Sequence, residues 1–299
     1  MKVRPPLVFA VLAAAVLSST PSRAGADPPG LDALYDRVAK DARAGRPLVV
    51  QVHVALCDNH QLVCGGRGLG DGDDLEKNLY WATSGGLRGW FGRRGSGWTL
   101  AARERGARGG VIETLVWRRR VEPSGALASR GVRAPFDVFV VADGWRGRAI
   151  DRAIDAYAAD LFGAEPRAVA LPDGTTLAAG GAAHVVAYVG HDRWMDRDDF
   201  AWPAPGGGPV KGTIAVACFS ADYLAAVPAP ARVPLLMTRD FLFAGSHSFE
   251  GAVRAFAAGE SLAGIRVAAA RAYADGEGKS FARVQYAFTN PSDAHWKKR

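Results

Sequence analysis

The sequence has no apolar run long enough to cross a membrane, and it is poor in residues that bind metals. A membrane-spanning helix needs roughly 20 consecutive apolar residues, and neither Leu7–Leu17 nor any later stretch is that long. The chain has three cysteines and six histidines among 299 residues, and their spacing matches no zinc site. The sequence therefore predicts no stable membrane insertion, no metal and no cofactor.

A strong excess of charge is also absent. The formal net charge is +7, and it falls to +4 for residues 27–299, because the first 26 residues contain Lys2, Arg4 and Arg23 but no acid. The one dense basic cluster, Arg118–Arg120, is typical of a solvated strand end. Because nucleic-acid-binding proteins carry a basic patch or stripe, no nucleic acid partner is expected. The oligomeric state is not indicated.

The N-terminus has the three parts of a secretory signal peptide. Lys2 and Arg4 form a charged region, Leu7–Leu17 forms a short apolar region, and Ala24-Gly25-Ala26 fits a cleavage site. We expect residues 1–26 to be a signal peptide that is cleaved near Ala26. The rest of the chain is then expected to be secreted or periplasmic.

The odd number of cysteines is informative in an exported protein. Cys57 and Cys64 flank a short segment between an apolar strand and a glycine-rich loop, and an oxidising compartment favours a disulfide between them. Cys218 is then left as a free thiol. The alternative is that all three cysteines are reduced and buried as small apolar residues.

The apolar pattern alternates between helices and strands along the chain. Helical spacing occurs at 31–44, 145–163 and 246–260, and 75–91 is a weaker helix candidate with a Gly-Gly break. Strands are predicted at 47–56, 109–119, 134–143, 184–190, 213–218 and 232–238, whereas 264–273 fits either a helix or a strand. Several strands are too uniformly apolar to face water, which is typical of a parallel sheet covered by helices. We expect residues 27–299 to form a single α/β domain, a three-layer α/β/α sandwich with a mainly parallel sheet.

Two of these strands end in the two members of a nucleophile–base pair. The strand 184–190 is followed by His191, and the strand 213–218 ends in Cys218. Functional groups collect beyond the carboxyl ends of parallel strands, and neighbouring strands lie about 5 Å apart, so the side chains meet if the strands are adjacent. The imidazole then takes the thiol proton, and the thiolate attacks a carbonyl carbon. The alternative is that His191 caps a loop and Cys218 packs in the core.

Further groups are expected close to this predicted dyad. A helix that begins just after Cys218 would lower the pKa of the thiol. The backbone N–H of Cys218, together with one near Gly190, would bind a developing oxyanion. Asp192 and Ser220, which follow the two catalytic candidates in the chain, are also candidate oxyanion or pocket residues.

Acidic and amide side chains before and within the glycine-rich loop have two interpretations. Asp58 and Asn59 end the strand 47–56, and they either line the pocket or only form the turn. The loop 71–76 is dense in acids, which suggests Ca²⁺, but its spacing does not match an EF-hand. A solvated turn is the alternative for this loop.

The segments that carry His191 and Cys218 resemble the caspase–gingipain–legumain superfamily of cysteine peptidases, known as clan CD. There the histidine follows one apolar block in a turn rich in Gly and His, and the cysteine closes the next block, often after alanine, as in "VAC" here. This resemblance covers roughly residues 134–260. The stretches "VALCDN", "LGDGDD", "NLYW", "YVGHDRWMD" and "ACFSADYL" are similar to an uncharacterised exported bacterial family with the same fold. The resemblance implies a caspase-like fold and a peptide or protein substrate.

The chain departs from the superfamily at two positions. Members usually have glycine directly after the histidine, where its N–H helps to bind the oxyanion, but this chain has Asp192. Caspases follow the cysteine with a Gln-Gly type sequence, but Phe219 and Ser220 follow here. The resemblance implies a cysteine endopeptidase. It leaves as alternatives a catalytically inactive binding or scaffold protein on the same fold, or an amidase or acyl-transfer enzyme that uses the same dyad.

Charged residues near the dyad bear on the residue recognised at P1, the position before the cleaved bond. Asp192, Asp196 and Asp222 follow the two catalytic candidates, and a pocket carboxylate favours arginine or lysine at P1. Arg193 and Arg197 lie between these acids and favour the opposite preference. The sequence indicates a basic P1 residue but leaves an acidic one open.

Overall fold

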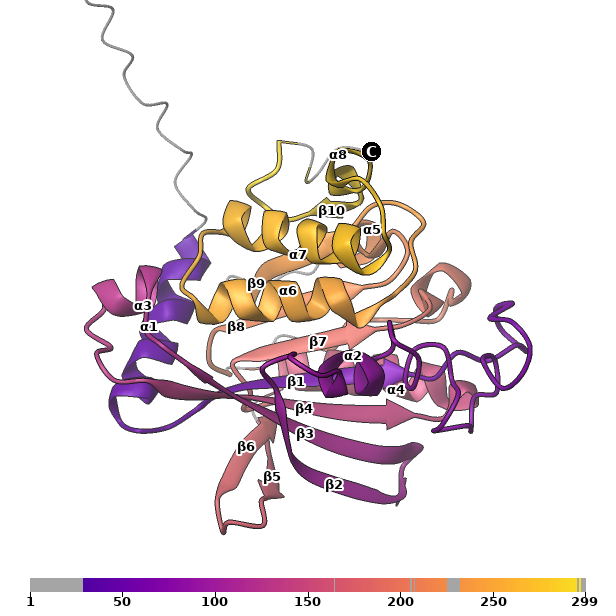
Figure 1. Cartoon of the computed structure of the whole chain (residues 1–299), viewed down its shortest axis with the longest axis horizontal. Coiled ribbons are helices and arrows are strands. Elements are labelled where there is room, and N and C mark those ends of the chain that lie inside the picture. Colours follow the sequence, from indigo (N-terminus) through magenta and orange to yellow (C-terminus); the bar gives the residue numbers. More distant parts are fainter. Residues whose placement is uncertain are drawn as a thin grey trace, which may run out of the picture.

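Eight strands form one mixed sheet through the middle of the protein (Figure 1). The computed structural model describes residues 29–163, 165–204, 206, 208–224, 232–294 and 296, and the expected signal peptide lies outside these residues. The strand order is β10-β9-β8-β7-β1-β4-β3-β2. These strands are β1 (Leu48–Ala55), β2 (Thr99–Arg108), β3 (Val111–Val121), β4 (Phe136–Trp145), β7 (Val185–Val189), β8 (Lys211–Val216), β9 (Arg232–Thr238) and β10 (Phe288–Thr289).

The remaining elements cover this sheet or project from it. β5 (Pro166–Ala170) and β6 (Thr176–Gly180) form a separate antiparallel hairpin. The helices are α1 (Pro29–Arg43), α2 (Leu87–Gly92), α3 (Gly125–Ser129), α4 (Ile150–Phe162), α5 (Ser220–Leu224), α6 (Ser246–Ala257), α7 (Leu262–Gly276) and α8 (Phe281–Val284). Three short 3₁₀ turns are η1 (Gly147–Ala149), η2 (Arg193–Asp196) and η3 (Gln285–Ala287). None of the helices among the described residues is long and apolar enough to cross a membrane.

The five strands β9, β8, β7, β1 and β4 are parallel, and the outer strands are added in antiparallel fashion. From β1 the chain first builds the β4 side of the sheet, and it then crosses over to build β7, β8 and β9 on the other side. The direction of winding therefore reverses between β1 and β7. In open α/β sheets such a reversal leaves a crevice beyond the carboxyl ends of the strands.

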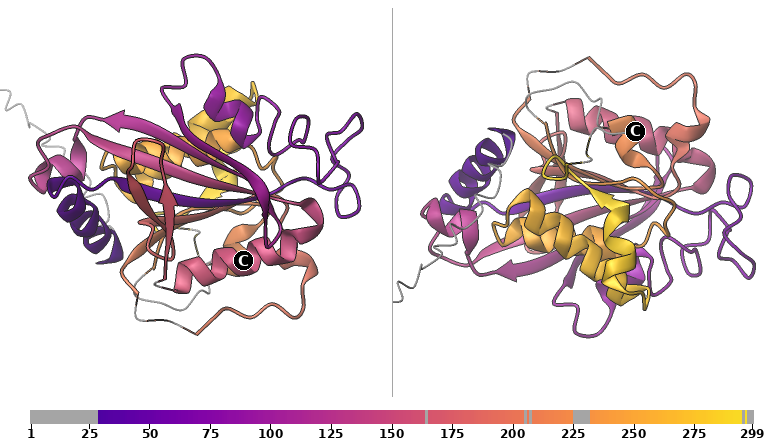
Figure 2. Two further views of the ribbon diagram at one scale, coloured as in Figure 1. Left: turned by 90° about the horizontal axis from the view of Figure 1, so that it is seen from below. Right: turned by 90° about the horizontal axis from the view of Figure 1, so that it is seen from above.

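Helices pack on both faces of the sheet, as Figure 2 shows. Val50, Val52 and Val54 of β1 point into a core shared with α1, α6 and α7. Val49 and Ala55 of the same strand point into a second core shared with α4. Alternate strand residues thus serve opposite layers, which explains why the strand sequences are largely apolar. The predicted α/β class, with a large and mostly parallel sheet flanked by helices, is confirmed.

Some predicted elements differ from the structure. Only α2 is helical within the candidate helix 75–91, because the chain turns back on itself at Gly85-Gly86. A Cβ atom at Gly86 would lie 2.7 Å from the carbonyl carbon of Trp81, so this close backbone approach requires glycine. The ambiguous segment 264–273 is helical and belongs to α7. The edge strand β2 was not predicted.

The C-terminal end of α4 is held by a buried cation from the sheet. Lys211 at the start of β8 is fully buried, and its Nζ donates to the carbonyl oxygens of Asp160 (2.6 Å), Leu161 (3.3 Å) and Gly163. The last carbonyls of a helix lack partners within the helix and carry partial negative charge. Burial lowers the pKa of Lys211 to about 8. This contact joins α4 to the strand that leads to Cys218.

Replacing Lys211 with methionine is expected to destabilise the protein. The Lys211→Met variant keeps the chain length but leaves buried carbonyl oxygens without their charged donor, which costs on the order of 3 kcal/mol. Chemical denaturation measures this loss as a lower midpoint. The exposed Lys40 of α1 provides a matched control, since Lys40→Met should leave the midpoint nearly unchanged. Equal effects of the two substitutions would contradict the structural role of Lys211.

Candidate active site

His191 and Cys218 lie at the carboxyl ends of two neighbouring parallel strands, beside the point where the sheet reverses its winding. β7 pairs with β8 from Val185–Gly212 to Val189–Val216. The Gly190 N–H donates to the Val216 carbonyl oxygen at 3.1 Å, which extends the ladder by one step. When the same register is continued by two residues beyond Val189 and Val216, His191 lies opposite Cys218. The backbone therefore delivers both residues to one edge of the sheet.

The imidazole of His191 is oriented by a carboxylate that the sequence did not identify as its partner. Its Nε2 lies 3.0 Å from Oδ2 of Asp196. The turn η2 brings Asp196 back toward the histidine, five positions along the chain. Because an ionised carboxylate only accepts hydrogen bonds, Nε2 carries the proton and Nδ1 is the basic nitrogen of the neutral ring.

Aromatic side chains hold the backbone around His191 in place. The hydroxyl of Tyr188 donates to the His191 carbonyl oxygen at 2.8 Å. The ring of Trp194 packs edge-on against Tyr188, with ring centroids 5.2 Å apart. Gly190 has φ = +156°, and a Cβ there would lie 3.1 Å from the Tyr188 hydroxyl. Glycine thus allows the turn to close over Tyr188 and to present His191 at the edge.

Cys218 is a free and partly buried thiol. Its Sγ lies 3.7 Å from the carbonyl oxygen of Leu242, which accepts from it. Burial raises the pKa of the thiol, and the negative charges of Asp192 and Asp240 raise it further. The expectation that a following helix lowers this pKa is therefore wrong. The helix α5 has only five residues, and burial beside carboxylates outweighs it.

The chain bends sharply directly after the thiol. Phe219 has φ = +51°, a left-handed conformation that is unusual for a bulky residue. Its N–H donates to the Asp240 carbonyl oxygen at 3.4 Å, and its ring packs edge-on against Phe241, with centroids 4.7 Å apart. These contacts hold the residue that follows Cys218 in a strained conformation. Such strain often occurs at functional sites.

Asp192 has a buried carboxyl group without a hydrogen-bond partner. Its side chain is fully buried, and neither oxygen has a partner of good geometry among the described residues. The pKa of Asp192 is raised to about 7, mainly by burial and also by the charges of Asp196 and Asp222, while the backbone N–H groups of Met195 and Trp194 partly offset this rise. The carboxyl group is thus close to half-ionised at neutral pH. It stands where the superfamily pattern has glycine.

Two backbone donors at the edge of the sheet are not used by the fold. Within the described part of the chain, the N–H groups of Cys218 and Asp192 donate to no backbone carbonyl oxygen. The N–H of Gly190 itself is occupied by Val216. An oxyanion beside the thiol would therefore be bound by the N–H of Cys218 and by a donor just after Gly190.

The predicted disulfide joins Cys57 and Cys64, with Cα atoms 6.1 Å apart. Asn59 supports the loop between them, since its Oδ1 accepts from the Cys64 N–H at 2.9 Å and its Nδ2 donates to the Gly65 carbonyl at 3.0 Å. Asp58 accepts from the His60 N–H at 3.0 Å. These contacts favour the turn-forming interpretation of Asp58 and Asn59.

Ser220 faces the interior of the fold rather than the edge of the sheet. Its side chain is fully buried, its Oγ donates to the Ala215 carbonyl oxygen at 2.8 Å, and it accepts from the Thr238 N–H at 3.0 Å. Ser220 thus joins the end of β8 to β9. It fixes the position of Cys218 without lining a pocket.

The acidic loop 71–76 uses its carboxylates within the turn and in ion pairs. Asp71 and Asp74 accept from backbone N–H groups two and three positions later. Asp73 pairs with Arg146, and Glu76 pairs with Arg88 at 2.8 Å. Among the described residues, no three His, Cys, Asp or Glu side chains gather as a metal site would require. The carboxylates of this loop thus stabilise the turn that the loop itself forms.

Thiol labelling is expected to distinguish the three cysteines. Without reductant, denatured protein should take up one equivalent of N-ethylmaleimide, and peptide mapping should place it on Cys218. After reduction it should take up three, because Cys57 and Cys64 are released. Three equivalents without reductant, or a label on Cys57 alone, would contradict this pairing.

Replacing Asp192 with asparagine is expected to lower the pKa of Cys218. Asp192, with a pKa of about 7, is ionised at the higher pH where the thiol titrates. Its negative charge opposes thiolate formation, and an amide of the same shape removes that repulsion. The rate of Cys218 alkylation by iodoacetamide, followed against pH, should reach its midpoint at lower pH in Asp192→Asn.

Asp199 provides the control for this measurement. It is exposed and pairs with Arg197 at 3.3 Å, so Asp199→Asn should leave the alkylation profile unchanged. A midpoint that does not move in Asp192→Asn, or that moves to higher pH, would show that the Asp192 charge does not act on the thiol.

No family model, curated protein or solved structure matches the chain.

Proposed function

We propose that the protein is an exported, caspase-like cysteine peptidase that uses Cys218 as nucleophile and His191 as general base. The observation that carries this proposal is the register of β7 and β8, which brings the two residues level at one edge of the sheet. The pairing of Asp196 with His191 supports it, because an oriented imidazole is what the third member of a catalytic triad provides. The disulfide is compatible with an oxidising compartment.

In this mechanism the thiol of Cys218 loses its proton to Nδ1 of His191. The thiolate attacks the carbonyl carbon of the peptide bond, and the oxyanion is bound by backbone N–H groups. The imidazolium is stabilised by Asp196 and then protonates the departing amine. Water finally releases the acyl group from the sulfur. Because the thiol donates to Leu242 in the free protein, substrate binding must turn it toward His191.

Exposed apolar side chains at the same edge of the sheet favour a peptide substrate. Among the described residues, six large apolar side chains are exposed, and four of them, Leu62, Val63, Met195 and Phe241, follow β1, β7 or β9. They come from loops at the carboxyl ends of the parallel strands. Exposed apolar groups gathered around a site mark a binding surface for another chain.

The charge around the thiol favours a basic substrate residue. Asp192 and Asp240 act on Cys218, and Asp222 acts on Asp192. Arg197 forms an ion pair with Asp155 at 2.9 Å, and Arg193 forms one with Asp151 at 2.9 Å. Since these arginines are already paired, the acids beside the thiol favour arginine or lysine at P1.

A second candidate function is a binding or scaffold protein without catalysis. The observation that favours it is the raised pKa of Cys218, which keeps the thiol protonated at neutral pH. An amidase or acyl-transfer enzyme would use the same two residues on a different carbonyl substrate. These functions predict different results with peptide substrates.

Digestion of a peptide library under reducing conditions tests the proposal. The wild-type chain without residues 1–26 should cleave after arginine or lysine. Cys218→Ala and His191→Ala should abolish cleavage, and Asp196→Asn should reduce it on the order of a hundredfold through loss of imidazole orientation. Asp199→Asn serves as the control, because Asp199 lies on the same loop and pairs only with Arg197 among the described residues.

The possible outcomes separate the functions. Cleavage that persists in Cys218→Ala would exclude the dyad. If no peptide is cleaved, hydrolysis of simple amides and esters that depends on Cys218 would support the amidase. If neither is hydrolysed, peptides from the same library that bind Cys218→Ala would support the binding protein.

A further inference from the structure

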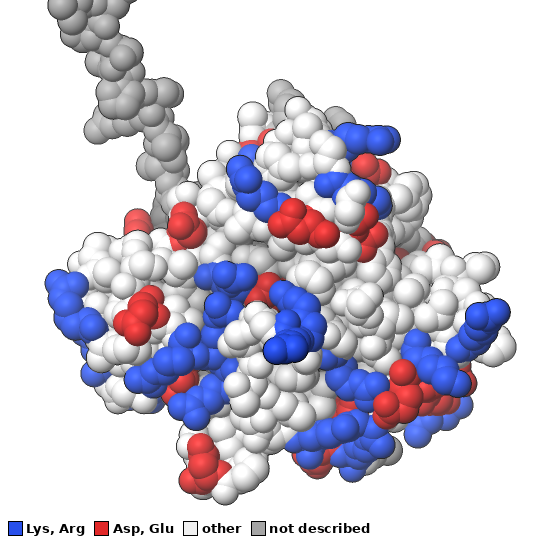
Figure 3. Space-filling model, in the orientation of Figure 1, with Lys and Arg blue, Asp and Glu red and all other residues white. Residues whose placement is uncertain are grey.

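Three arginines from separate segments gather on the α6 side of the sheet. Arg93 follows α2, Arg119 lies in β3 and Arg254 lies in α6. Burial lowers the pKa of Arg93 and of Arg119, and for both of them the nearby charge of Arg254 lowers it further. The three guanidinium groups are therefore close enough to repel one another. Figure 3 shows positive side chains in the middle of this face.

Among the described residues, one acidic side chain lies close enough to act on all three positive charges. Glu250 of α6 is almost fully buried, its Oε1 accepts from the Trp98 Nε1–H at 3.0 Å, and it lies 3.7 Å from Nε of Arg254. It also acts on Arg93 and Arg119. One negative charge thus stands against three positive charges, of which Arg254 is exposed and Arg93 and Arg119 are partly buried. An anion that bound here would add the negative charge that Glu250 alone does not supply.

Most N–H donors of these arginines have no acceptor. Within the described residues, Arg119 donates to the Ser96 carbonyl oxygen at 2.9 Å, Arg93 donates to the Trp90 carbonyl oxygen, and Arg254 makes only its ion pair. A guanidinium has five donors in a planar fork that matches a carboxylate. The rings of Trp90 and Trp98 lie beneath Arg93 and Arg119, which fixes both guanidinium groups in place.

An apolar pocket opens beside this cluster. It has a volume of about 150 Å³ and is lined by Trp98, Arg119, Val121, Val138, Val253, Arg254, Ala257 and Ala258. An apolar cavity of about 150 Å³ is large enough to hold a benzene ring. Two of the three arginines thus border a pocket whose other walls are apolar or aromatic. The pocket combines a site for one negative charge with a space for one compact apolar group.

We propose that this pocket binds a small monocarboxylate with a compact apolar body about the size of a benzene ring. The apolar body would lie between Trp98 and Val253. The carboxylate would accept hydrogen bonds from Arg119 and Arg254, and Arg93 would add a third positive charge. An anion without an apolar body would leave the pocket empty, and an apolar molecule without charge would leave the arginines uncompensated. The proposal therefore requires both parts of the ligand.

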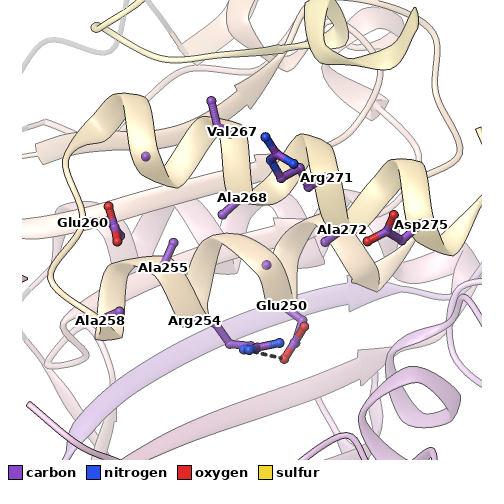
Figure 4. Close-up of a pocket in the computed structure, with 12 residues that line it drawn as sticks. Glu250, Arg254, Ala255, Ala258, Glu260, Val267, Ala268, Arg271, Ala272 and Asp275 are labelled. Atoms are coloured by element: carbon purple, nitrogen blue, oxygen red, sulfur yellow. Dashed lines mark ion pairs between the residues drawn. The ribbon is translucent and has the colours of Figure 1, made fainter. Parts of the chain in front are cut away.

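This pocket is separate from the candidate active site and does not depend on the proposed peptidase function. α6 begins at Ser246, just after the segment that borders Cys218, and Arg254 lies roughly 12 Å further along the helix axis. Figure 4 shows Arg254 and Glu250 on the side of α6 that faces away from α7. The larger groove between α6 and α7, with a volume of about 570 Å³, adjoins this pocket, shares Arg254 and Ala258 with it, and includes Arg271.

Calorimetric titration with benzoate tests the proposal. The protein without residues 1–26 should bind benzoate saturably at one site, whereas acetate and benzyl alcohol should bind at least about tenfold more weakly, since each lacks one part of the ligand. Arg119→Gln and Arg254→Gln should weaken benzoate binding by about tenfold or more. Val121→Phe should abolish binding because the larger ring fills the pocket without altering its charge.

Arg271→Gln is the matched control, because Arg271 lines the neighbouring groove but not this pocket, and it should leave benzoate affinity unchanged. The proposal is overturned if no binding occurs up to about 10 mM, where a ligand of nine non-hydrogen atoms with modest energy per atom would bind. It is equally overturned if acetate binds as tightly as benzoate, or if folded Arg119→Gln and Arg254→Gln variants bind benzoate as the wild type does.

Discussion

The parallel pairing of β1, β7 and β8, buried on both faces, is the constraint on which the rest of the structure depends. Every side chain of β7 is buried, and polar side chains within β1 and β8, such as His53 and Lys211, are buried and paired inside the fold. Polar groups that a substrate can reach are therefore confined to the positions where each strand leaves the sheet. His191 and Cys218 occupy two such positions at the same level, next to the reversal of winding between β1 and β7. The location of the candidate site thus follows from the sheet itself.

The same burial works against an easily formed thiolate. Cys218 lies below the surface next to the carboxyl groups of Asp192 and Asp240, and both effects favour the neutral thiol. An imidazolium of His191 placed beside the sulfur would act in the opposite sense, because it would stabilise the thiolate. In the free protein the thiol donates to Leu242, so the favourable pair is not formed. A basic substrate side chain would neutralise the carboxylates, which would couple binding to activation of the thiol.

The sequence predicted those features that depend on local pattern. β1 was identified because its apolar residues alternate, and the other parallel strands because burial on both faces makes their residues largely apolar. The disulfide was identified because Cys57 and Cys64 lie on one short loop. The edge strand β2 was missed, since its solvent-facing residues, such as Arg105, obscure the alternation. The contact between Asp196 and His191 was missed as well, because it depends on the tight turn η2 rather than on the spacing of residue types.

Cationic side chains next to apolar layers of this protein occur in two settings, and their difference explains why one of them is a candidate binding site. Lys211 and Arg232 are buried at the end of α4, where carbonyl oxygens accept from both of them. The partial negative charge at the helix C-terminus compensates their positive charge, so they need no further partner. Arg119 and Arg254 lie beside an apolar pocket, where Glu250 alone compensates them and most of their donors have no acceptor. Arg119 is partly buried and Arg254 is exposed, so their free donors remain open to an anion that enters the pocket.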